Sequence, residues 1–239
     1  MPPIPRRSLL LSALTLPAWA TGAAPAAKCC ALTFDDGPDP VQTARVLDTL
    51  QAHGGVPATF FLIGERVTRR TQPVLKRLLA EGHELGHHSW RHAHMAPFTR
   101  AQAVADFRRA QAAIVGATGR TPRFFRPPFG EVSDTLYDAT PLPFAGGIAA
   151  HDWLGGEPTA RGRADRILND PRLADGAIVL LHDVQPDPHP TPEALNLLIP
   201  ALRARGFEFL TLSTLFARQR VVPRAGERRL WEVVPTTDS

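Results

Sequence analysis

The chain has 239 residues but only two cysteines, and these are adjacent. Adjacent cysteines cannot form the spaced disulfides that hold many small secreted domains together, so the fold must depend on a hydrophobic core. Cys29 and Cys30 open an apolar run that ends at Phe34, and this run predicts a buried strand. We therefore assign no chemistry to either thiol.

Lysine is almost absent as well, because Lys28 and Lys76 are the only lysines among 27 basic residues. The other basic residues are arginines, and they form no contiguous run that could follow a phosphate backbone. With a formal net charge of only +4, the chain is not expected to bind nucleic acid.

No hydrophobic run reaches the ~18 residues that a membrane-spanning helix requires. The apolar stretch at residues 9–16 follows Arg6 and Arg7 and precedes a small-residue site at residues 18–20, an order typical of an export signal. The paired arginines resemble a twin-arginine signal, with an ordinary secretory signal as the alternative. We expect residues 1–20 to direct export, and the mature protein to be periplasmic or secreted without integral membrane association.

Short apolar runs alternate with helical patterns through the rest of the chain, which is typical of strand–helix units on a parallel sheet. Capping boxes are predicted at Thr99 with Gln102 and at Asp39 with Gln42. About seven such units in roughly 210 residues predict a single α/β domain, a distorted or incomplete parallel (β/α) barrel. The domain is expected at residues 21–239 with a short C-terminal tail from about 218, and its strands at residues 31–34, 58–62, 84–86, 123–125, 144–148, 177–181 and 209–212.

Polar residues stand directly after the expected strands. Asp35 and Asp36 follow the first strand, and the adjacent histidines His87 and His88 follow the third. In parallel α/β folds the carboxyl ends of the strands converge on one face, and functional sites are built there. The next three strands are followed by further polar residues, which we expect on the same face: Arg126, Asp152 and His182.

Five of the nine histidines fall between residues 83 and 94. His88 and His92 are four residues apart, so one helical turn would place both rings where they could bind the same cation at about 2 Å. The consecutive carboxylates Asp35 and Asp36 repel each other unless a cation relieves the repulsion. One carboxylate with two histidines makes three protein ligands and an open position, which is typical of a catalytic metal site.

The strand ends also carry five short motifs, which are Thr33-Phe34-Asp35-Asp36-Gly37-Pro38, His88-Ser89-Trp90-Arg91-His92, Arg126-Pro127-Pro128-Phe129-Gly130, Asp152-Trp153 and Leu180-Leu181-His182-Asp183. In this order they resemble the motifs of the polysaccharide deacetylases with the NodB homology domain, carbohydrate esterase family 4. The resemblance covers nearly the whole mature chain. It implies a distorted (β/α) barrel and removal of acetyl groups from N-acetylated or O-acetylated sugars.

The resemblance implies roles for five residues of the first three motifs. Asp36, His88 and His92 would hold one divalent metal ion, with zinc expected and cobalt or another divalent ion as alternatives. Asp35 would be the general base that deprotonates a water activated by that ion. Arg126 would pair with Asp35 and keep it ionised.

The last two motifs would supply the acid and part of the substrate pocket. His182 would protonate the leaving group, and Asp152 would orient this imidazole and raise its pKa. The backbone N–H of Phe129 would bind the oxyanion together with the metal. Trp153 and Leu180 would enclose the acetyl methyl group.

Three positions depart from the family pattern. His87 stands where asparagine is usual, and its imidazole could compete for the metal or take over a hydrogen bond. Ala149 replaces an additional aspartate that many members have, and Phe129 replaces a frequent tyrosine. The remaining histidines near the motifs are assigned no function: His83, His94, His151 and His189.

We therefore expect a metal-dependent hydrolase of linear, non-peptide amides that deacetylates N-acetylglucosamine units. Its substrate would be a polymer or oligomer such as chitin, peptidoglycan or an exopolysaccharide. An amide gains more than an ester from a positioned acid, because an amine is the poorer leaving group. The alternatives are an acetylxylan-type O-acetyl esterase, a non-catalytic carbohydrate-binding relative, and an iron oxygenase with the same two-histidine, one-carboxylate set.

Overall fold

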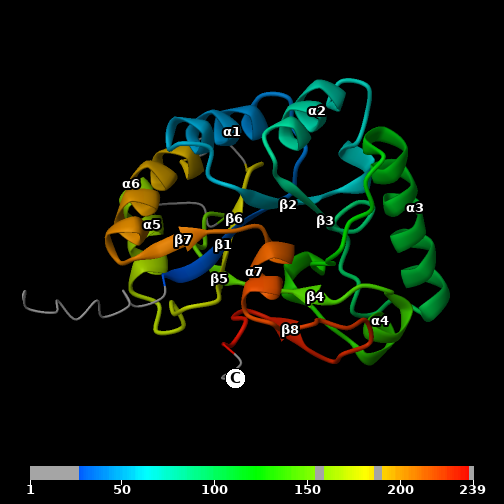
Figure 1. Ribbon diagram of the computed structural model, residues 1–239. Helices are drawn as coiled ribbons and strands as arrows, with labels where there is room; N and C mark the ends of the chain where they lie inside the picture. The colour runs from blue at the N-terminus through cyan, green and yellow to red at the C-terminus, as the bar shows by residue number, and fades with distance from the viewer. Residues whose placement is uncertain (1–26, 154–158, 186–189, 237–239) are drawn as a thin grey trace, which may run out of the picture.

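The computed structural model describes residues 27–153, 159–185 and 190–236 (Figure 1). The expected export signal at residues 1–20 and His189 lie outside these ranges. Among the described residues, no helix combines the length and the apolar character that crossing a membrane would need.

Six parallel strands form the central sheet, in the order β3-β2-β1-β6-β5 with β7 also paired to β1. A second sheet pairs β4 with β8. The strands are β1 (Lys28–Asp35), β2 (Ala58–Leu62), β3 (Glu84–His87), β4 (Phe144–Ala145), β5 (Ile148–Ala149), β6 (Ala177–His182), β7 (Phe207–Phe209) and β8 (Leu230–Trp231).

Isolated bridges extend this sheet toward a barrel. Phe125 bridges His87 at the end of β3 on one side and Phe144 of β4 on the other. Only Gly146 and Gly147 separate β4 from β5, which pairs with β6. The strands therefore curve round from β3 to β6, and the predicted fold class, a distorted and incomplete parallel barrel, is confirmed.

Two predicted strands are shorter than expected. The strand at residues 123–125 is reduced to the bridges of Phe125, and the strand at residues 144–148 is split at the two glycines. The Gly146 N–H donates to the Trp231 carbonyl at 2.7 Å, and the Gly146 carbonyl accepts from Arg126. These bonds remove Gly146 from the ladder with β6.

The last predicted strand, residues 209–212, was placed too late in the chain. The structure has β7 at Phe207–Phe209, and Leu212 begins the helix α7. The Thr211 hydroxyl accepts from the Thr214 N–H and so caps α7, which favours a helix over a longer strand.

Helices cover the outside of the sheet, as Figure 1 shows for α1, α2, α3, α5 and α6. The α3 helix begins with the predicted capping box of Thr99 and Gln102. Only half of the box predicted at Asp39 is formed: the Asp39 carboxylate accepts from the Gln42 N–H at 2.8 Å, but the Gln42 side chain accepts from the Gln185 N–H instead of binding back to Asp39. The helices are α1 (Gln42–Ala52), α2 (Gln72–Ala80), α3 (Arg100–Thr118), α4 (Asp134–Ala139), α5 (Ala160–Leu168), α6 (Thr191–Ala204) and α7 (Leu212–Arg218), with 3₁₀ turns η1 (Gly64–Arg66) and η2 (Pro128–Gly130).

Alternation along the strands separates two packed layers. In β1, Leu32 and Phe34 belong to the large core with α1, α2 and α6, whereas Ala31 belongs to the inner cluster that includes residues of α7. Thr33 and Asp35 continue the inner row, because successive side chains of a strand point to opposite faces. The inner face of the barrel therefore leads from an apolar base to polar residues at the carboxyl ends of the strands.

The segment after Arg218, expected as a short tail, contains β8. Beyond β8, Val233 forms an antiparallel bridge with Ala177, and the Val234 N–H donates to the Gly176 carbonyl at 2.8 Å. This segment lies against the amino-terminal end of β6. It also contributes Leu230 and Glu232 to the cavity described below.

Candidate active site

A cavity of about 420 Å³ lies where the strands end. Of the ten site residues singled out in the sequence, nine line this cavity, and Asp152 is buried behind His182. The structure therefore brings together residues from five separate places in the chain. The nine are Asp35, Asp36, His88, His92, Arg126, Phe129, Trp153, Leu180 and His182.

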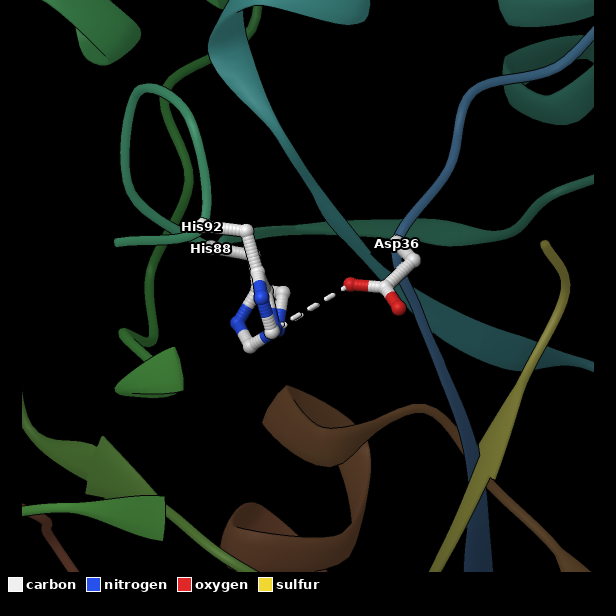
Figure 2. A group of neighbouring side chains, drawn as sticks. All are labelled: Asp36, His88 and His92. Atoms are coloured by element: carbon white, nitrogen blue, oxygen red, sulfur yellow. Dashed lines mark ion pairs between the residues drawn. The ribbon is translucent and has the colours of Figure 1, made fainter. Parts of the chain in front are cut away.

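Asp36, His88 and His92 converge on one point of the cavity (Figure 2). The Asp36 Oδ1 atom lies 3.5 Å from His88 Nε2 and 3.4 Å from His92 Nε2, and the three ligand atoms lie within 4.8 Å of one another. Among the described residues, Asp36 Oδ1 is buried without a hydrogen-bond partner. One orphaned carboxylate oxygen facing two imidazole nitrogens fits a divalent cation.

His88 is held in the tautomer that a metal ligand requires. Its Nδ1–H donates to the Arg126 carbonyl at 2.7 Å, which leaves the Nε2 lone pair directed at Asp36. Burial lowers the pKa of His88 to about 3, so the ring is neutral.

The helical turn expected between His88 and His92 is wrong. The segment is a loop in which Ser89 and His92 have positive φ angles of 65° and 56°. Its backbone is bonded elsewhere: the His88 N–H donates to Leu62 of β2, and the Ser89 and Trp90 carbonyls accept from Gly64 and Glu65 of η1. These long-range bonds use the groups that a helix would need, and the loop instead folds both rings onto one carboxylate.

His87 does not face the metal position. Its Nε2–H donates to the Phe107 carbonyl at 3.0 Å, its Nδ1 accepts from the Ser89 N–H at 3.2 Å, and its ring stacks on Phe107. Burial lowers its pKa to about 4. Of the two possibilities considered for His87, competition for the metal is therefore excluded by geometry, and it supports the loop that carries His88 and His92.

Asp35 is held by a buried arginine. The Arg126 Nη1 atom donates to Asp35 Oδ1 at 2.7 Å and to the Thr33 hydroxyl at 2.8 Å. The Arg126 Nε and Nη2 atoms donate to the carbonyls of Ala145 and Gly146. Because every edge of the guanidinium is bonded, its position is fixed, and it neutralises and orients the carboxylate.

Asp36 reaches the cavity only because the chain turns sharply after β1. Consecutive residues of a strand point to opposite faces, so Asp35 and Asp36 could not both face the cavity in a continued strand. The φ angle of Asp36 is 75°, in the left-handed region, which reverses its direction. Asp35 Oδ2 then lies 3.9 Å from His88 Nε2, next to the three convergent ligands.

His182 and Asp152 form a buried carboxylate–imidazole pair. Asp152 accepts from both the backbone N–H and the Nδ1–H of His182 at 2.7 Å, and from the Thr191 hydroxyl at 2.9 Å. Burial disfavours the imidazolium, but the charges of Asp152, Asp35 and Asp36 outweigh it and raise the pKa of His182 to about 9. His182 therefore holds a proton at neutral pH.

Two exposed aromatic rings line the cavity, and each is stacked on a histidine that had been assigned no function. Phe129, which is 55% exposed, stacks on His94 with 3.9 Å between ring centroids. Trp153, which is 42% exposed, stacks on His151 at 5.0 Å. The only sequence signal for these two histidines is that each lies two residues from a site residue.

The cavity also has lining residues that the sequence did not indicate. Gln185 follows β6, and Leu230 and Glu232 come from the segment around β8. Glu232 forms an ion pair with Arg172 at 3.0 Å. None of these residues belongs to a motif, and Leu230 and Glu232 reach the cavity only because the C-terminal segment returns to the barrel.

A family model described as polysaccharide deacetylase matches residues 22–143. The chain is 37% identical over 207 residues to a bifunctional xylanase/deacetylase of Pseudobutyrivibrio xylanivorans, covering 87% of this chain and 33% of that protein. It is 35% identical over 196 residues to a peptidoglycan-N-acetylglucosamine deacetylase of Listeria monocytogenes, covering 80% and 40%. The chain thus spans only a third to two-fifths of the length of these two relatives.

Among solved structures, the chain is similar to a family 4 acetyl xylan esterase from Clostridium thermocellum, solved in complex with a cobalt ion. The TM-score is 0.84 and the sequence identity is 46%, over 87% of this chain and 100% of the other. The similarity therefore extends beyond residue 143, where the match to the family model ends.

Proposed function

Since the chain belongs to the polysaccharide deacetylase family, we propose that it is a metal-dependent hydrolase that removes acetyl groups from a carbohydrate. The observation that carries the proposal is the convergence of Asp36, His88 and His92 beside Asp35, in a cavity that also contains the protonated His182. A binding protein would have no need of the Arg126–Asp35 and Asp152–His182 pairs. An oxygenase would need neither a base nor an acid next to its metal.

Asp36, His88 and His92 would hold one divalent ion, which we propose to be zinc, with cobalt or another divalent ion as alternatives. The donor set of two neutral imidazoles and one carboxylate with an open position suits a catalytic zinc site. When bound, such an ion lowers the pKa of a water molecule toward about 7 and polarises the acyl oxygen.

The residues around this position divide the proton transfers between them. Asp35, fixed by Arg126, takes the proton of the attacking water. His182, charged by its contact with Asp152, donates a proton to the departing amine or alcohol. The backbone N–H of Phe129 would donate to the developing oxyanion, and Trp153 with Leu180 would enclose the methyl group.

We propose that the substrate is an amide, an N-acetylglucosamine unit of a polymer or oligomer such as peptidoglycan, chitin or an exopolysaccharide. Two observations support an amine leaving group. The relative from Listeria monocytogenes is a peptidoglycan-N-acetylglucosamine deacetylase. His182 has a pKa raised to about 9, so its imidazolium can donate a proton at neutral pH. The second candidate is an O-acetyl ester of xylan, which the similarity to the acetyl xylan esterase favours.

We further propose that residues 1–20 are an export signal and that residues 21–239 form one deacetylase domain. The arginine pair and the apolar stretch that follows it support export. The enzyme would then act in the periplasm or outside the cell, where acetylated glycans are present.

Acetate release tests these proposals. Metal-loaded protein is given N-acetylated chito-oligomers, peptidoglycan fragments and acetylxylan in parallel, with Asp35→Asn as the negative control. We expect turnover of the N-acetylated substrates. Turnover of acetylxylan alone would contradict the amide assignment, and no acetate from any acetylated carbohydrate would contradict the hydrolase itself.

A further inference from the structure

Positive charge is concentrated in one quarter of the sequence, although the basic residues form no contiguous run. Residues 64–123 contain eleven Lys and Arg and four Asp and Glu, a net charge of +7. Because the whole chain carries +4, all other residues together carry −3. This imbalance is large for a surface, where charges of both signs are usually interspersed.

The charged segment forms one side of the molecule, from η1 through α2 and β3 to α3 (Figure 1, cyan to green). Within the described part of the chain, Arg77 is the one basic residue of this segment that forms an ion pair. The others have no carboxylate within ion-pair distance among the described residues. Their charge is therefore not neutralised by direct ion pairs, although Asp106 lies close enough to Arg91 and Arg109 for their charges to lower its pKa.

Three of these arginines belong to the segment of Trp90 and the elements that contact it: Arg91 follows Trp90 in the chain, Arg109 stacks on its ring, and the half-buried Arg66 lies in η1. Arg91 lies between Trp90 and the cavity residue His92 and is exposed. The exposed Arg109 of α3 stacks on the Trp90 ring, with its Cζ atom 4.0 Å from the centroid. Arg66 lies in η1, whose Glu65 N–H donates to the Trp90 carbonyl at 2.9 Å.

We call Arg66, Arg91 and Arg109 the arginine rim. Two carboxylates belong to the same elements, the exposed Glu65 and the half-buried Asp106, which accepts from the Trp90 N–H at 2.8 Å. The rim remains positive, because three further exposed arginines on these elements add to it. These are Arg69 and Arg70 after η1 and Arg108 on α3.

We infer that the arginine rim binds carboxylates of the substrate, so that the preferred substrate is an acidic glycan rather than a neutral one. Guanidinium groups bind carboxylates in a bidentate geometry, and exposed, unpaired guanidiniums lose little on exchanging water for such a partner. Arg91 directly precedes the cavity residue His92, which brings groups that flank the acetylated sugar within reach of this arginine. The inference rests on the proposed function, since it places the acetylated sugar in the cavity.

Two sources could supply the carboxylates: the peptide stems of a cell-wall glycan and the uronate branches of a xylan. Peptidoglycan fragments and glucuronate-bearing acetylxylan oligomers represent them. Each is compared with the same material after amidation of its carboxyl groups, and a neutral N-acetylchito-oligomer is the reference. The measured quantity is kcat/KM from acetate release.

The test variant is Arg66→Gln with Arg91→Gln, since neither side chain is part of the proposed catalytic machinery. We expect a loss of about tenfold in kcat/KM on an acidic glycan, mostly through KM, and less than twofold on the neutral oligomer. Lysine at both positions should restore much of the loss, because it keeps the charge. Arg166→Gln is the matched control, an exposed arginine on α5 that forms no ion pair among the described residues.

Salt provides an independent measurement. Raising the ionic strength from about 0.1 M to about 1 M shortens the screening length from about 10 Å to about 3 Å, so it should abolish the preference of the wild-type protein for acidic substrates. The double variant should show little salt dependence. A preference that survives high salt would contradict the inference.

Other outcomes would also overturn it. Equal losses on acidic and neutral substrates would indicate a structural role for the arginines. The same loss in Arg166→Gln would indicate a diffuse effect of net charge. If the arginine rim is needed to bind anionic lipid vesicles or duplex DNA but not any glycan, the rim serves a different partner and the inference is wrong.

Failure of the proposed function is distinguishable from failure of this inference. If the wild-type protein releases no acetate, co-sedimentation with intact and carboxyl-amidated cell-wall sacculi still measures the rim. Binding that depends on Arg66 and Arg91 and is lost on amidation supports the rim without a hydrolase. Binding that is unaffected by substitution of Arg66 and Arg91 and by amidation contradicts the inference.

Discussion

His88 and His182 line the same cavity and are both buried, yet their pKa values shift in opposite directions, to about 3 and about 9. The difference lies in the group that each Nδ1 contacts. His88 donates to the neutral carbonyl of Arg126, so burial prevails and the ring stays uncharged. His182 donates to the carboxylate of Asp152, whose charge outweighs burial.

Two copies of one side chain in one cavity are thus prepared for opposite tasks, chiefly by whether Nδ1 bonds to a neutral carbonyl or to a carboxylate, with the charges of Asp35 and Asp36 adding to the effect at His182. A neutral ring offers a lone pair, as a metal ligand must, whereas a charged ring offers a proton. His87, next to His88 in the sequence, shows a third case, because both of its nitrogens are already bonded within the protein. The following predictions test whether the metal ligands and the proton donor are divided in this way, and what the residues next to them contribute.

The largest effect should come from separating the adjacent histidines. His88→Ala should abolish stoichiometric metal binding, because only Asp36 and His92 remain, while His87→Phe should retain it, since His87 stacks on Phe107 and not at the metal position. Metal content after dialysis, measured by elemental analysis, checks this. A full complement of metal in His88→Ala would contradict the ligand assignment.

The adjacent carboxylates should differ in a similar way. Asp35→Asn should keep the metal and lose about 10³-fold in kcat, as expected for removal of a general base. Asp36→Asn should lose both the metal and activity, because Asp36 Oδ1 is the atom that faces both histidines. Equal loss of metal in the two variants would disprove the division of roles.

Asp152, the partner of the proposed acid His182, should control the pH dependence of the reaction. If His182 is the acid, the alkaline limb of kcat/KM reports the deprotonation of its imidazolium. Asp152→Asn removes the charge that raises this pKa, so the limb should move to lower pH while kcat falls about 10²-fold. A limb that stays in place would assign the titration to another group.

The same pair predicts how stability depends on pH. The pKa of His182 in the folded protein is about 9, above its ordinary value of 6.5. Its contribution to the free energy of unfolding is therefore fully present below about pH 6.5 and is lost as the pH rises through about 9. Between these values the melting temperature of the metal-free protein should fall more in the wild type than in Asp152→Asn. Parallel melting curves would contradict this linkage.

The smallest effect should come from the stacked ring outside the ligand set. His94 covers one face of Phe129. The Phe129 and His92 rings are nearly perpendicular, with 4.5 Å between their centroids. The Nδ1 atom of His94 lies 3.0 Å from Glu131 Oε1. His94→Ala should lower kcat a few-fold, with metal content unchanged, and His94→Phe should restore it by keeping the stack. His53→Ala, which removes a half-buried imidazole at the C-terminal end of α1 and away from the cavity lining, is the control. No recovery in His94→Phe would show that stacking is not what matters.

The sequence predicted the core of the site well because it lies at strand ends. A parallel sheet brings the carboxyl ends of its strands to one face, so Asp35, His88, Arg126 and His182 had to meet once the strands were located. His87 ends β3 and His88 follows it, and adjacent side chains of an extended chain point to opposite sides, which agrees with their different partners.

Tertiary contacts decided what local patterns could not. The spacing of His88 and His92 suggested a helical turn, but the loop's backbone bonds to β2 and η1, which are remote in sequence, prevent one. The pairing of His94 with Phe129 depends on two loops that meet only in the folded chain.

From the sequence alone came the prediction of which residues meet at the strand ends and of the parallel α/β class that gathers them. The family resemblance added the carboxylate–arginine and carboxylate–histidine pairs. These depend on residue identity and on periodicity within single elements. The tertiary structure alone decided which nitrogen of each histidine is free, which arginines stand unpaired beside the cavity, and that the segment around β8 supplies Leu230 and Glu232 to its wall. Those properties arise from contacts between residues far apart in the chain, which no local pattern encodes.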